Sequence, residues 1–583
     1  MKLKRLAYCM SVAIVAAPLM AQTSTEPIKV EKVEVTGSAI KRVQNEGALP
    51  VQIITREQLD RSGTATVEQF LTQITANGNG FDNLASTSDV VSGANRGNNG
   101  LSAANLRSQG SNATLILLNG RRLAAHGLNG GTVDLKQIPL DAVARVEVLK
   151  DGASATYGTD AIGGVINFIL RKDFQGVTAT ASVDVTEQGG GSVARGSLLG
   201  GWGDLAMDRF NVMASIAYSQ NEKLLGTQRD FVNTFQPNRG LSVDTTGTPF
   251  ATAAPIGQAR TILSSRNSAG ALSNGTGPTQ PGTTQAINRI NVLDLPGGAG
   301  CNSIPNTQAY DELLWDSPNA RYGCAWDTGR AATLQQPVDN VTGTLRAVFK
   351  VGDSLNLFAE ATASEVKTKK SFSNVQVISN NLQIRNAGLL AVYPSTGSAY
   401  NDIFNSIVGV FPTIAENRGQ PIAFRWRCIE CGPREIATES QTGRFLFGGE
   451  GALGNFDYKF GAWSAFSDTN STLGNGYFFI NKFVPLITSG TLNPFLRAGQ
   501  SLKPRWMDSL RRQRRAPRCT VANTPPTPLT RRFQAPCSNC PQATSRPRSA
   551  LIFVVRNTPS TAAKPRWLHN AISWQHRLTR ATS

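Results

Sequence analysis

The chain has 583 residues, of which 58 are Lys or Arg and 40 are Asp or Glu, so its formal net charge is +18. Gly is abundant (55 residues) and only 17% of the residues are charged, which favours a turn-rich β protein over a helical enzyme. The charge would suit nucleic-acid binding, but residues 503–583 hold 16 basic residues and one acidic residue. The remaining 502 residues are close to neutral, so we expect no nucleic-acid partner.

The first 21 residues have the pattern of a secretory signal peptide. Basic residues within the first five positions precede an apolar run through Leu19, and a small residue, Ala21, precedes the expected cleavage site. About 14 apolar residues are too few for a helix that spans a bilayer. Since no later stretch is long enough either, a membrane location would require a closed β-barrel.

A polar linker, residues 22–48, follows the signal peptide and contains one segment that alternates like a β-strand. This segment consists of Glu31, Lys32, Val33, Glu34, Val35, Thr36 and Gly37. An extended segment of this kind can form backbone hydrogen bonds with the edge of a partner's sheet. Without its context, it is equally an ordinary strand.

Residues 49–173 have the pattern of a compact α+β domain. We expect a strand over residues 50–55, a helix over residues 56–62 that Thr55 caps, and a second helix that begins at Thr66. The apolar residues of the second helix share one face and are expected in the core; they are Val67, Phe70, Leu71 and Ile74.

Two motifs in this domain are more specific than its periodicity. In the first, Arg107 and Asn112 precede a buried strand, Thr114–Leu118, and Asn119-Gly120-Arg121 follows it. Asn-Gly at this place is the signal of a type I′ turn.

The second motif lies in residues 144–172 and contains two apolar strands, Arg145–Leu149 and Gly164–Leu170, joined by a Gly-rich link. Its letters RVEVLKDGASATYGTDAIGGVINF are similar, nearly one for one, to the end of the plug domain of TonB-dependent outer-membrane receptors. The first motif resembles another plug motif of that family, with Ser108 where Gly is usual and Ala113 where Arg is common. The chain is identified as a member of this family by resemblance.

The resemblance implies roles for particular residues. The segment Glu31–Gly37 becomes the TonB box, which the periplasmic protein TonB captures. Arg107, Arg145 and Glu147 are expected to form ion pairs with the barrel wall, because charges in a narrow lumen must be paired or hydrated; the alternative is that each is a solvated strand residue. The full set of plug-motif and barrel-locking residues is Arg107, Asn112, Asn119, Gly120, Arg121, Arg145, Glu147, Asp151, Gly152, Tyr157, Gly158, Gly163, Gly164 and Asn167.

From Gly176 onward, apolar and polar residues alternate in segments of about ten. The clearest segments are residues 177–186 and 210–219 and two hairpins, 345–361 and 444–466, with expected turns at Gly352-Asp353 and Gly454-Asn455. A lipid-facing barrel has this signature, and a soluble β-sandwich alternates too, but the neighbouring plug favours the barrel. The expected fold class is mainly β: a small α+β plug domain, then an incomplete transmembrane antiparallel β-barrel over residues 174–502.

Two stretches inside that barrel region show little alternation and much Gly, Pro, Asn and Thr, namely residues 222–340 and 380–431. We expect them to be surface loops, with two strands inside the first, and to contain the substrate contacts.

Residues 503–583 differ from the rest of the chain. They hold ten of the 29 Pro residues, and their arginines, such as the Arg511–Arg515 cluster, would be costly against lipid. Residues 174–502 leave room for about ten strands, against the 22 of plugged transporters. We expect the tail to be an out-of-frame translation of a receptor gene or disordered; the alternative is a genuine basic extension. The absence of alternating strands from every other reading frame past codon 502 would refute the frameshift.

Four cysteines suggest disulfides. Cys301 and Cys324 are candidates for a loop disulfide in an oxidising compartment. Cys428 and Cys431 form a C-x-x-C, which is either a tight loop disulfide or half of a metal site. A four-Cys site would need the pair Cys537 and Cys540, more than a hundred residues away, so we expect no metal.

The motifs of common enzyme classes are not completed in this sequence. His126 is the one His before position 569, which argues against a His-based triad or metal site in the body of the chain. Ser38-Ala39-Ile40-Lys41 matches S-x-x-K, but no K-T-G follows. We predict no enzymatic activity and no cofactor.

The predicted function is energised uptake of a scarce nutrient by a TonB-dependent receptor in the outer membrane of a Gram-negative bacterium. Siderophore-bound iron, a carbohydrate and a peptide all remain possible substrates. The expected partners are TonB with its inner-membrane energising complex, a small nutrient ligand and outer-membrane lipid. The alternative is a periplasmic or surface binding protein that has a plug-like domain and does not transport.

Overall fold

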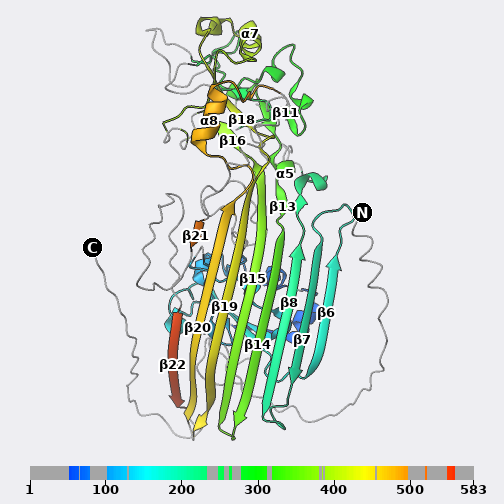
Figure 1. Cartoon of the computed structure of the whole chain (residues 1–583), viewed down its shortest axis with the longest axis vertical. Coiled ribbons are helices and arrows are strands. Elements are labelled where there is room, and N and C mark those ends of the chain that lie inside the picture. The colour runs from blue at the N-terminus through cyan, green and yellow to red at the C-terminus, as the bar shows by residue number, and fades with distance from the viewer. Residues whose placement is uncertain are drawn as a thin grey trace, which may run out of the picture.

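The protein has three parts in the computed structural model: a small α+β domain, a long antiparallel sheet, and a subdomain at one end of that sheet (Figure 1). The structure describes residues 51–64, 66–78, 101–127, 130–232, 247–254, 261–264, 278–310, 318–379, 384, 388–453, 456–496, 519–521 and 548–557. The signal peptide and TonB box expected at residues 1–21 and 31–37 lie outside these residues.

The small domain, which we call the plug, is built around a five-stranded sheet with the order β1-β4-β5-β2-β3. The β2–β5 pair is parallel and the other pairs are antiparallel. Its elements are β1 (Val51–Thr55), α1 (Arg56–Arg61), α2 (Val67–Thr72), β2 (Thr114–Leu118), β3 (Arg121–Arg122), η3 (Leu135–Gln137), η4 (Leu140–Ala142), β4 (Val143–Leu149), α3 (Ser154–Tyr157) and β5 (Gly164–Leu170).

Local sequence signals explain the plug helices. Thr55 caps α1 in a capping box, in which the Gln58 backbone N–H donates to Thr55 Oγ1 and the Gln58 side chain accepts from the Thr55 N–H. Thr66 caps α2 through its hydroxyl, which accepts a hydrogen bond from the Gln69 backbone N–H. The four apolar residues predicted for the core, Val67, Phe70, Leu71 and Ile74, are all buried, so these two helices and their core face are confirmed.

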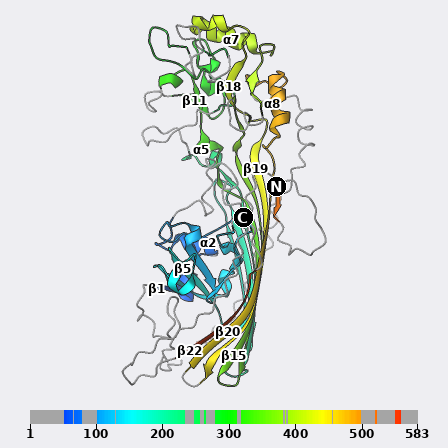
Figure 2. The same ribbon diagram turned by 90° about the vertical axis from the view of Figure 1, so that its left-hand side faces the viewer.

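The long sheet, which we call the wall, has nine strands in the order β21-β20-β19-β15-β14-β8-β7-β6, with β22 also paired to β20. Figure 2 shows the plug against one face of the wall, towards which the lower end of the wall bends. The strands are β6 (Gly176–Asp184), β7 (Val193–Trp202), β8 (Phe210–Asn221), β14 (Val338–Val351), β15 (Leu355–Asn374), β19 (Pro433–Leu453), β20 (Phe456–Leu473), β21 (Cys519–Val521) and β22 (Arg548–Asn557). Every pair is antiparallel, and in the described residues the wall is open, since β6 pairs with β7 alone.

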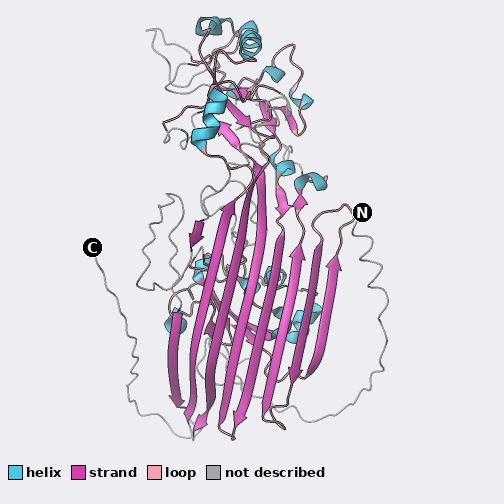
Figure 3. Cartoon of the chain, viewed as in Figure 1, coloured by secondary structure: helices cyan, strands magenta, loops and turns pink. Residues whose placement is uncertain are grey.

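The strands of the wall are longer than the sequence predicts. The two hairpins form at the expected turns, but β15 and β19 have 20 and 21 residues instead of about ten. The long strands stand side by side in Figure 3, with the helices gathered in the plug and the terminal subdomain.

The two faces of the wall have opposite chemistry. Polar side chains are buried on the face towards the plug, among them Thr344, Thr362, Thr442 and Thr469. Large apolar side chains are exposed on the other face; they include Leu198, Ile216, Val341, Leu345, Phe349, Val351, Phe445, Phe447 and Phe466. A β-sandwich would cover its apolar face with a second sheet. The outward apolar face is instead typical of a barrel in lipid, and the predicted fold class is confirmed.

A row of charged residues limits the apolar face. Asp339, Lys367 and Glu439 are register partners on β14, β15 and β19, and Lys367 pairs with Glu365 (2.7 Å) and Glu439 (3.6 Å). Between this row and the turns at the opposite end, the outward residues of β14 are apolar over about ten residues. With a strand tilt of about 40°, that length corresponds to a band of roughly 25 Å.

The third part is a subdomain with a hydrophobic core of its own, above the end of the wall (Figure 1). Its main elements are β10 (Thr252–Ala253), β11 (Thr307–Ala309), β12 (Cys324–Trp326), β16 (Gln376–Ile378), β17 (Val392–Tyr393), α7 (Tyr400–Val410), β18 (Ile422–Arg427) and α8 (Ile480–Thr488). The core joins residues far apart in sequence, such as Phe250, Phe404 and Ile487. Two stretches that the sequence predicts to be surface loops therefore combine into one compact unit.

The tail contains two strands that its composition does not predict. Residues of β22 pair with β20 over ten positions, from Phe456↔Asn557 to Ala465↔Arg548, and β21 pairs with the other end of β20. Whether residues 503–583 arise from a shifted reading frame stays a prediction. Among the described residues, no helix is long and apolar enough to cross a membrane.

Candidate functional site at the contact between plug and wall

The turn between β2 and β3 is one of the parts of the plug that reach the wall. Asn119 and Gly120 have φ values of 51° and 72°, as a type I′ turn requires. The Leu170 N–H donates to Asn119 Oδ1 and the Gly120 N–H donates to Asn167 Oδ1, each at 2.9 Å. The turn is thereby tied to β5, and the Asn119 amide NH₂ is directed at the wall.

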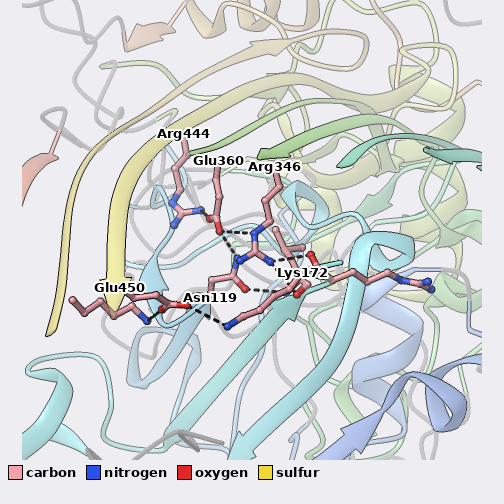
Figure 4. A network of polar contacts seen from close by, with 9 residues as sticks. Asn119, Lys172, Arg346, Glu360, Arg444 and Glu450 are labelled. Carbon is pink, nitrogen blue, oxygen red and sulfur yellow. Dashed lines mark hydrogen bonds and ion pairs between the residues drawn. The ribbon is translucent and has the colours of Figure 1, made fainter. Parts of the chain in front are cut away.

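Glu360 of β15 is the centre of a buried charge network (Figure 4). Its carboxylate accepts a hydrogen bond from Asn119 Nδ2 at 2.5 Å. It also pairs with Arg346 Nε of β14 at 3.3 Å and with Arg444 Nη1 of β19 at 3.4 Å. The exposed fraction of all three charged side chains is 6% or less. Because these charges are removed from water, each depends on the others for compensation.

The register of the wall brings these three charges together. Arg346 and Glu360 are direct partners in the β14–β15 hairpin. Arg444 stands opposite Thr362, one inward-facing position from Glu360. All three side chains therefore point to the plug from neighbouring strands.

Arg346 also binds the plug backbone. Its Nη1 donates to the carbonyl oxygens of Leu170 (3.3 Å) and Arg171 (2.9 Å), where β5 ends. These carbonyls stand at the end of β5, so the guanidinium joins the plug backbone to the wall.

A second ion-pair contact lies nearer the turns of the wall. Lys172 Nζ pairs with Glu450 Oε1 of β19 at 3.3 Å, and Lys459 of β20 pairs with the other oxygen at 3.3 Å. Arg121 approaches the same region, since its Nη2 lies 3.2 Å from the position that a Cβ on Gly461 would occupy. Burial lowers the pKa of Arg121, and the carboxylates of Glu360 and Glu450 oppose this effect.

A third contact uses the backbone of η3. The carbonyl of Lys136 accepts hydrogen bonds from Thr342 Oγ1 (2.7 Å) and Asn340 Nδ2 (3.3 Å) of β14. The Lys136 ammonium is buried and pairs with Glu68 of α2 at 2.5 Å. Burial disfavours its charged form, but Glu68 and Asp134 outweigh this effect and raise the pKa of Lys136. Burial raises the pKa of Asp134.

Ion pairs of Arg107, Arg145 and Glu147 with the wall stay a prediction, because the ion pairs described for these residues lie within the plug. Arg107 pairs with Asp151 at 3.7 Å and Arg145 with Glu147 at 2.8 Å, all within the plug. Arg145 and Glu147 are two residues apart on β4, so their side chains share a face of the sheet and meet there.

The other plug-motif residues shape the backbone around this contact. Gly158 and Gly164 have positive φ values of 78° and 146°, which favour glycine. A Cβ on Gly163 would lie 2.8 Å from the Leu106 carbonyl. The side chain of Asn112 packs against Gly131, Asp151 accepts from the Gly152 N–H, and Tyr157 accepts from Arg122 through its carbonyl.

The residues that the sequence interpretation missed are Arg346, Glu360, Arg444, Lys172 and Glu450. One signal was available: Arg346 and Glu360 are each five residues from the strand ends at Val351 and Leu355, so a hairpin with a three-residue turn, 352–354, makes them partners. The place of Arg444 depends on the β15–β19 register, for which the sequence holds no comparable signal.

The cysteines are paired in the subdomain. Disulfides join Cys301 to Cys324 and Cys428 to Cys431, with Cα–Cα distances of 5.5 and 5.3 Å. The described residues contain no group of three or more His, Cys, Asp or Glu side chains that could hold a metal ion.

A small α+β domain is held by buried charges on the polar face of an antiparallel sheet whose other face is apolar and exposed. Residues 43–165 match the sequence model of the TonB-dependent Receptor Plug Domain. The chain therefore carries the plug of a TonB-dependent receptor, joined to strands of the barrel type.

Individual relatives are similar over part of their length. The vitamin B12 transporter BtuB of Photobacterium profundum is 32% identical over 162 residues, which cover 27% of this chain and 24% of that protein. A variant of the ferric enterobactin receptor of Pseudomonas aeruginosa is 15% identical, with 73% of this chain and 41% of that chain covered and a TM-score of 0.36. A siderophore receptor of Acinetobacter baumannii is 14% identical, with 73% of this chain and 46% of that chain covered and a TM-score of 0.30. The chain thus spans less than half of each.

Proposed function

We propose that this protein is a TonB-dependent outer-membrane receptor that takes up a scarce nutrient with energy supplied through TonB. The observation that carries the proposal is the buried contact of Asn119, Arg346 and Arg444 with Glu360, which seats a plug on the inner face of an outward-apolar wall. We take this contact to hold the plug in the path until the plug is moved.

The order of the plug sheet supports a mechanism of opening. β1 is one edge strand, β3 is the other, and β2 and β3 flank the Asn119-Gly120 turn that meets Glu360. A pull on the linker before β1 therefore enters at the edge opposite the lock. β1 is held in the sheet by five residue pairs with β4, so force on the linker loads this short ladder first.

A cleft of about 430 Å³ lies where such a movement would open a path. It is lined on the plug side by Arg56, Asp60 and Glu68 of α1 and α2, and on the wall side by Thr180 of β6 and Arg195 of β7. Displacement of the β1–α1–α2 segment would widen this polar cleft between plug and wall.

The test is capture of the full chain by the periplasmic domain of TonB. We expect capture of the wild type and its loss in Val33→Pro, because Pro removes a backbone donor from the pairing strand. Val43→Pro, in the same linker but outside Glu31–Gly37, is the matched control and should be captured normally. Equal capture of both variants would contradict the box assignment. In a receptor with a closed barrel, Val33→Pro should also abolish uptake without weakening ligand binding.

For the substrate we propose only a class, a small and scarce nutrient. Siderophore-bound iron, a carbohydrate and a peptide are all candidate substrates. Vitamin B12 is a further candidate, because one similar protein is a vitamin B12 transporter. The similarity covers too little of either chain to select one of them.

The second candidate is a periplasmic or surface binding protein that does not transport. The long subdomain with a core of its own favours it more than any other feature. Membrane fractionation separates the two: a receptor remains in the outer-membrane pellet after carbonate extraction, whereas a binding protein is released.

A further inference from the structure

Arg444 is a buried arginine of β19 that uses one part of its guanidinium in the contact with Glu360. Its side chain is 1% exposed, and Nη1 pairs with Glu360 Oε2 at 3.4 Å. Nε and Nη2 are also buried and have no hydrogen-bond partner within the described part of the chain. The N–H of Nε and one N–H of Nη2 are parallel, so together they match the two oxygens of a carboxylate or phosphate. We call this pair of donors the Arg444 fork, and buried donors of this kind are rarely left without a partner.

The cations around the Arg444 fork outnumber the carboxylates. Arg346 and Arg444 share the single negative charge of Glu360. Arg121 of the plug forms no ion pair with a described residue, and the carboxylates that act on it are Glu360 and Glu450. Glu450 is itself paired with two lysines, at 3.3 Å each. The contact between plug and wall therefore carries surplus positive charge, which an anion would compensate.

The plug covers the Arg444 fork. In the register of the wall, Arg444 stands opposite Thr362 of β15 and Ala465 of β20, and both of these residues are buried. Figure 4 shows Arg444 and Glu360 extending from the wall towards Asn119 of the plug turn. An oxyanion can therefore reach the fork only after the plug has left this part of the wall.

We propose that the Arg444 fork is a latent oxyanion site, which is uncovered when the plug leaves the wall and then binds a carboxylate or phosphate group of the nutrient in transit. The inference rests on the proposed uptake function and narrows its substrate class to anionic ligands. While the plug is seated, Glu360 holds one side of the guanidinium and the plug covers the other. After separation, Nε and Nη2 donate to two oxygens of the ligand. A ligand that binds the separated state alone shifts the plug towards that state.

The test is hydrogen exchange of the β2–β3 edge, residues 114–122, in the full chain in detergent micelles with inorganic phosphate and, separately, with citrate. KCl keeps the ionic strength constant, so that unspecific screening does not differ between samples. We expect at least one of the two anions to accelerate exchange, by about tenfold at a concentration ten times its dissociation constant. Kosmotropic anions such as phosphate otherwise strengthen apolar burial, which would slow exchange. Acceleration by phosphate alone identifies a phosphate group as the ligand, by citrate alone a carboxylate, and by both an oxyanion of either kind.

Arg444→Met removes the fork and should abolish the acceleration. The measured quantity is the ratio of exchange rates with and without the oxyanion in the same variant, so the loss of the pair with Glu360 cancels. Arg444→Lys keeps the charge without the fork and should show a smaller acceleration than the wild type. Arg418→Met is the matched control, because Arg418 is an exposed arginine of the subdomain that donates to Asn405 at 3.0 Å. It should respond as the wild type does.

Two results would overturn the latent site. One is the absence of acceleration by either oxyanion in the wild type, and the other is an equal ratio in Arg444→Met and Arg418→Met. Exchange in α7 should be the same in every sample, which separates movement of the plug from general unfolding. TonB is absent from this assay, so its failure leaves the capture result at Val33 intact.

Discussion

Glu360→Gln should loosen the plug from the wall while the rest of the fold remains. The change removes the negative charge between Arg346 and Arg444 but leaves an oxygen that can accept from Asn119. Removal of one partner from a buried ion pair costs about 3–5 kcal/mol. We take the lower value, about 3 kcal/mol, because the accepting oxygen is kept. Since 1.4 kcal/mol corresponds to a factor of ten, separation of the β2–β3 edge should become about a hundredfold more frequent.

Hydrogen exchange of a peptide that spans residues 114–122 measures this separation. The Asn119 and Gly120 amides donate within the plug, to the Phe168 carbonyl and to Asn167 Oδ1 of β5, so their exchange reports how often the β2–β3 edge leaves β5 once the wall no longer holds Asn119. Exchange in α7 of the subdomain should not change, which separates local opening from general unfolding.

The matched control for Glu360→Gln is Glu365→Gln. Glu365 lies on the same strand, faces outward and is paired at the surface with Lys367, where an ion pair adds little to stability. Equal exchange in the two variants would refute the argument that the buried carboxylate seats the plug.

Two further predictions concern the cysteines and His126. Unreduced peptide mass spectrometry should recover Cys301 linked to Cys324 and a Cys428–Cys431 peptide that lacks two hydrogens; free thiols at these positions would count against an oxidising compartment. Burial lowers the pKa of His126 to about 4 in the folded chain. Between about pH 6.5 and pH 4 the unfolded chain therefore carries a proton on His126 that the folded chain does not. The free energy of unfolding decreases as the pH falls through that range, by up to about 3 kcal/mol. His126→Gln should show a smaller decrease in the urea midpoint between pH 7.5 and pH 5, and an identical decrease in both proteins would contradict this assignment.

Local features of the fold follow from the sequence where the determining residues are neighbours. The capping box at Thr55, the type I′ turn at Asn119-Gly120 and the hairpin at Gly352-Asp353 each depend on a few adjacent residues, and each forms as predicted. Strand lengths were underestimated because β15 and β19 continue past the apolar band as charged, water-facing strands, for which alternation of apolar residues is no guide.

The contact site was harder to predict from the sequence, because the residues that meet there are far apart in the chain. Asn119 and Glu360 are separated by 241 residues, and their contact depends on how the plug sits on the wall. The resemblance to plug motifs indicated charged residues that lock the plug and named Arg107, Arg145 and Glu147; their pairing with the wall stays a prediction, and the wall residues Arg346, Glu360 and Arg444 were not foreseen. The subdomain was missed for a similar reason, since its core combines residues between Phe250 and Phe495 that have no common period.

The row of Asp339, Lys367 and Glu439 has a consequence for where a nutrient is first met. Beyond Glu365, β15 continues for nine residues to Asn374, which is about 30 Å of strand. If the apolar band lies in the outer membrane, this length stands in water outside the lipid and is stiffened by its pairing with β19. The subdomain would then be presented to the medium at a height comparable with the thickness of the hydrocarbon layer, and soluble reagents or antibodies should reach it on intact cells.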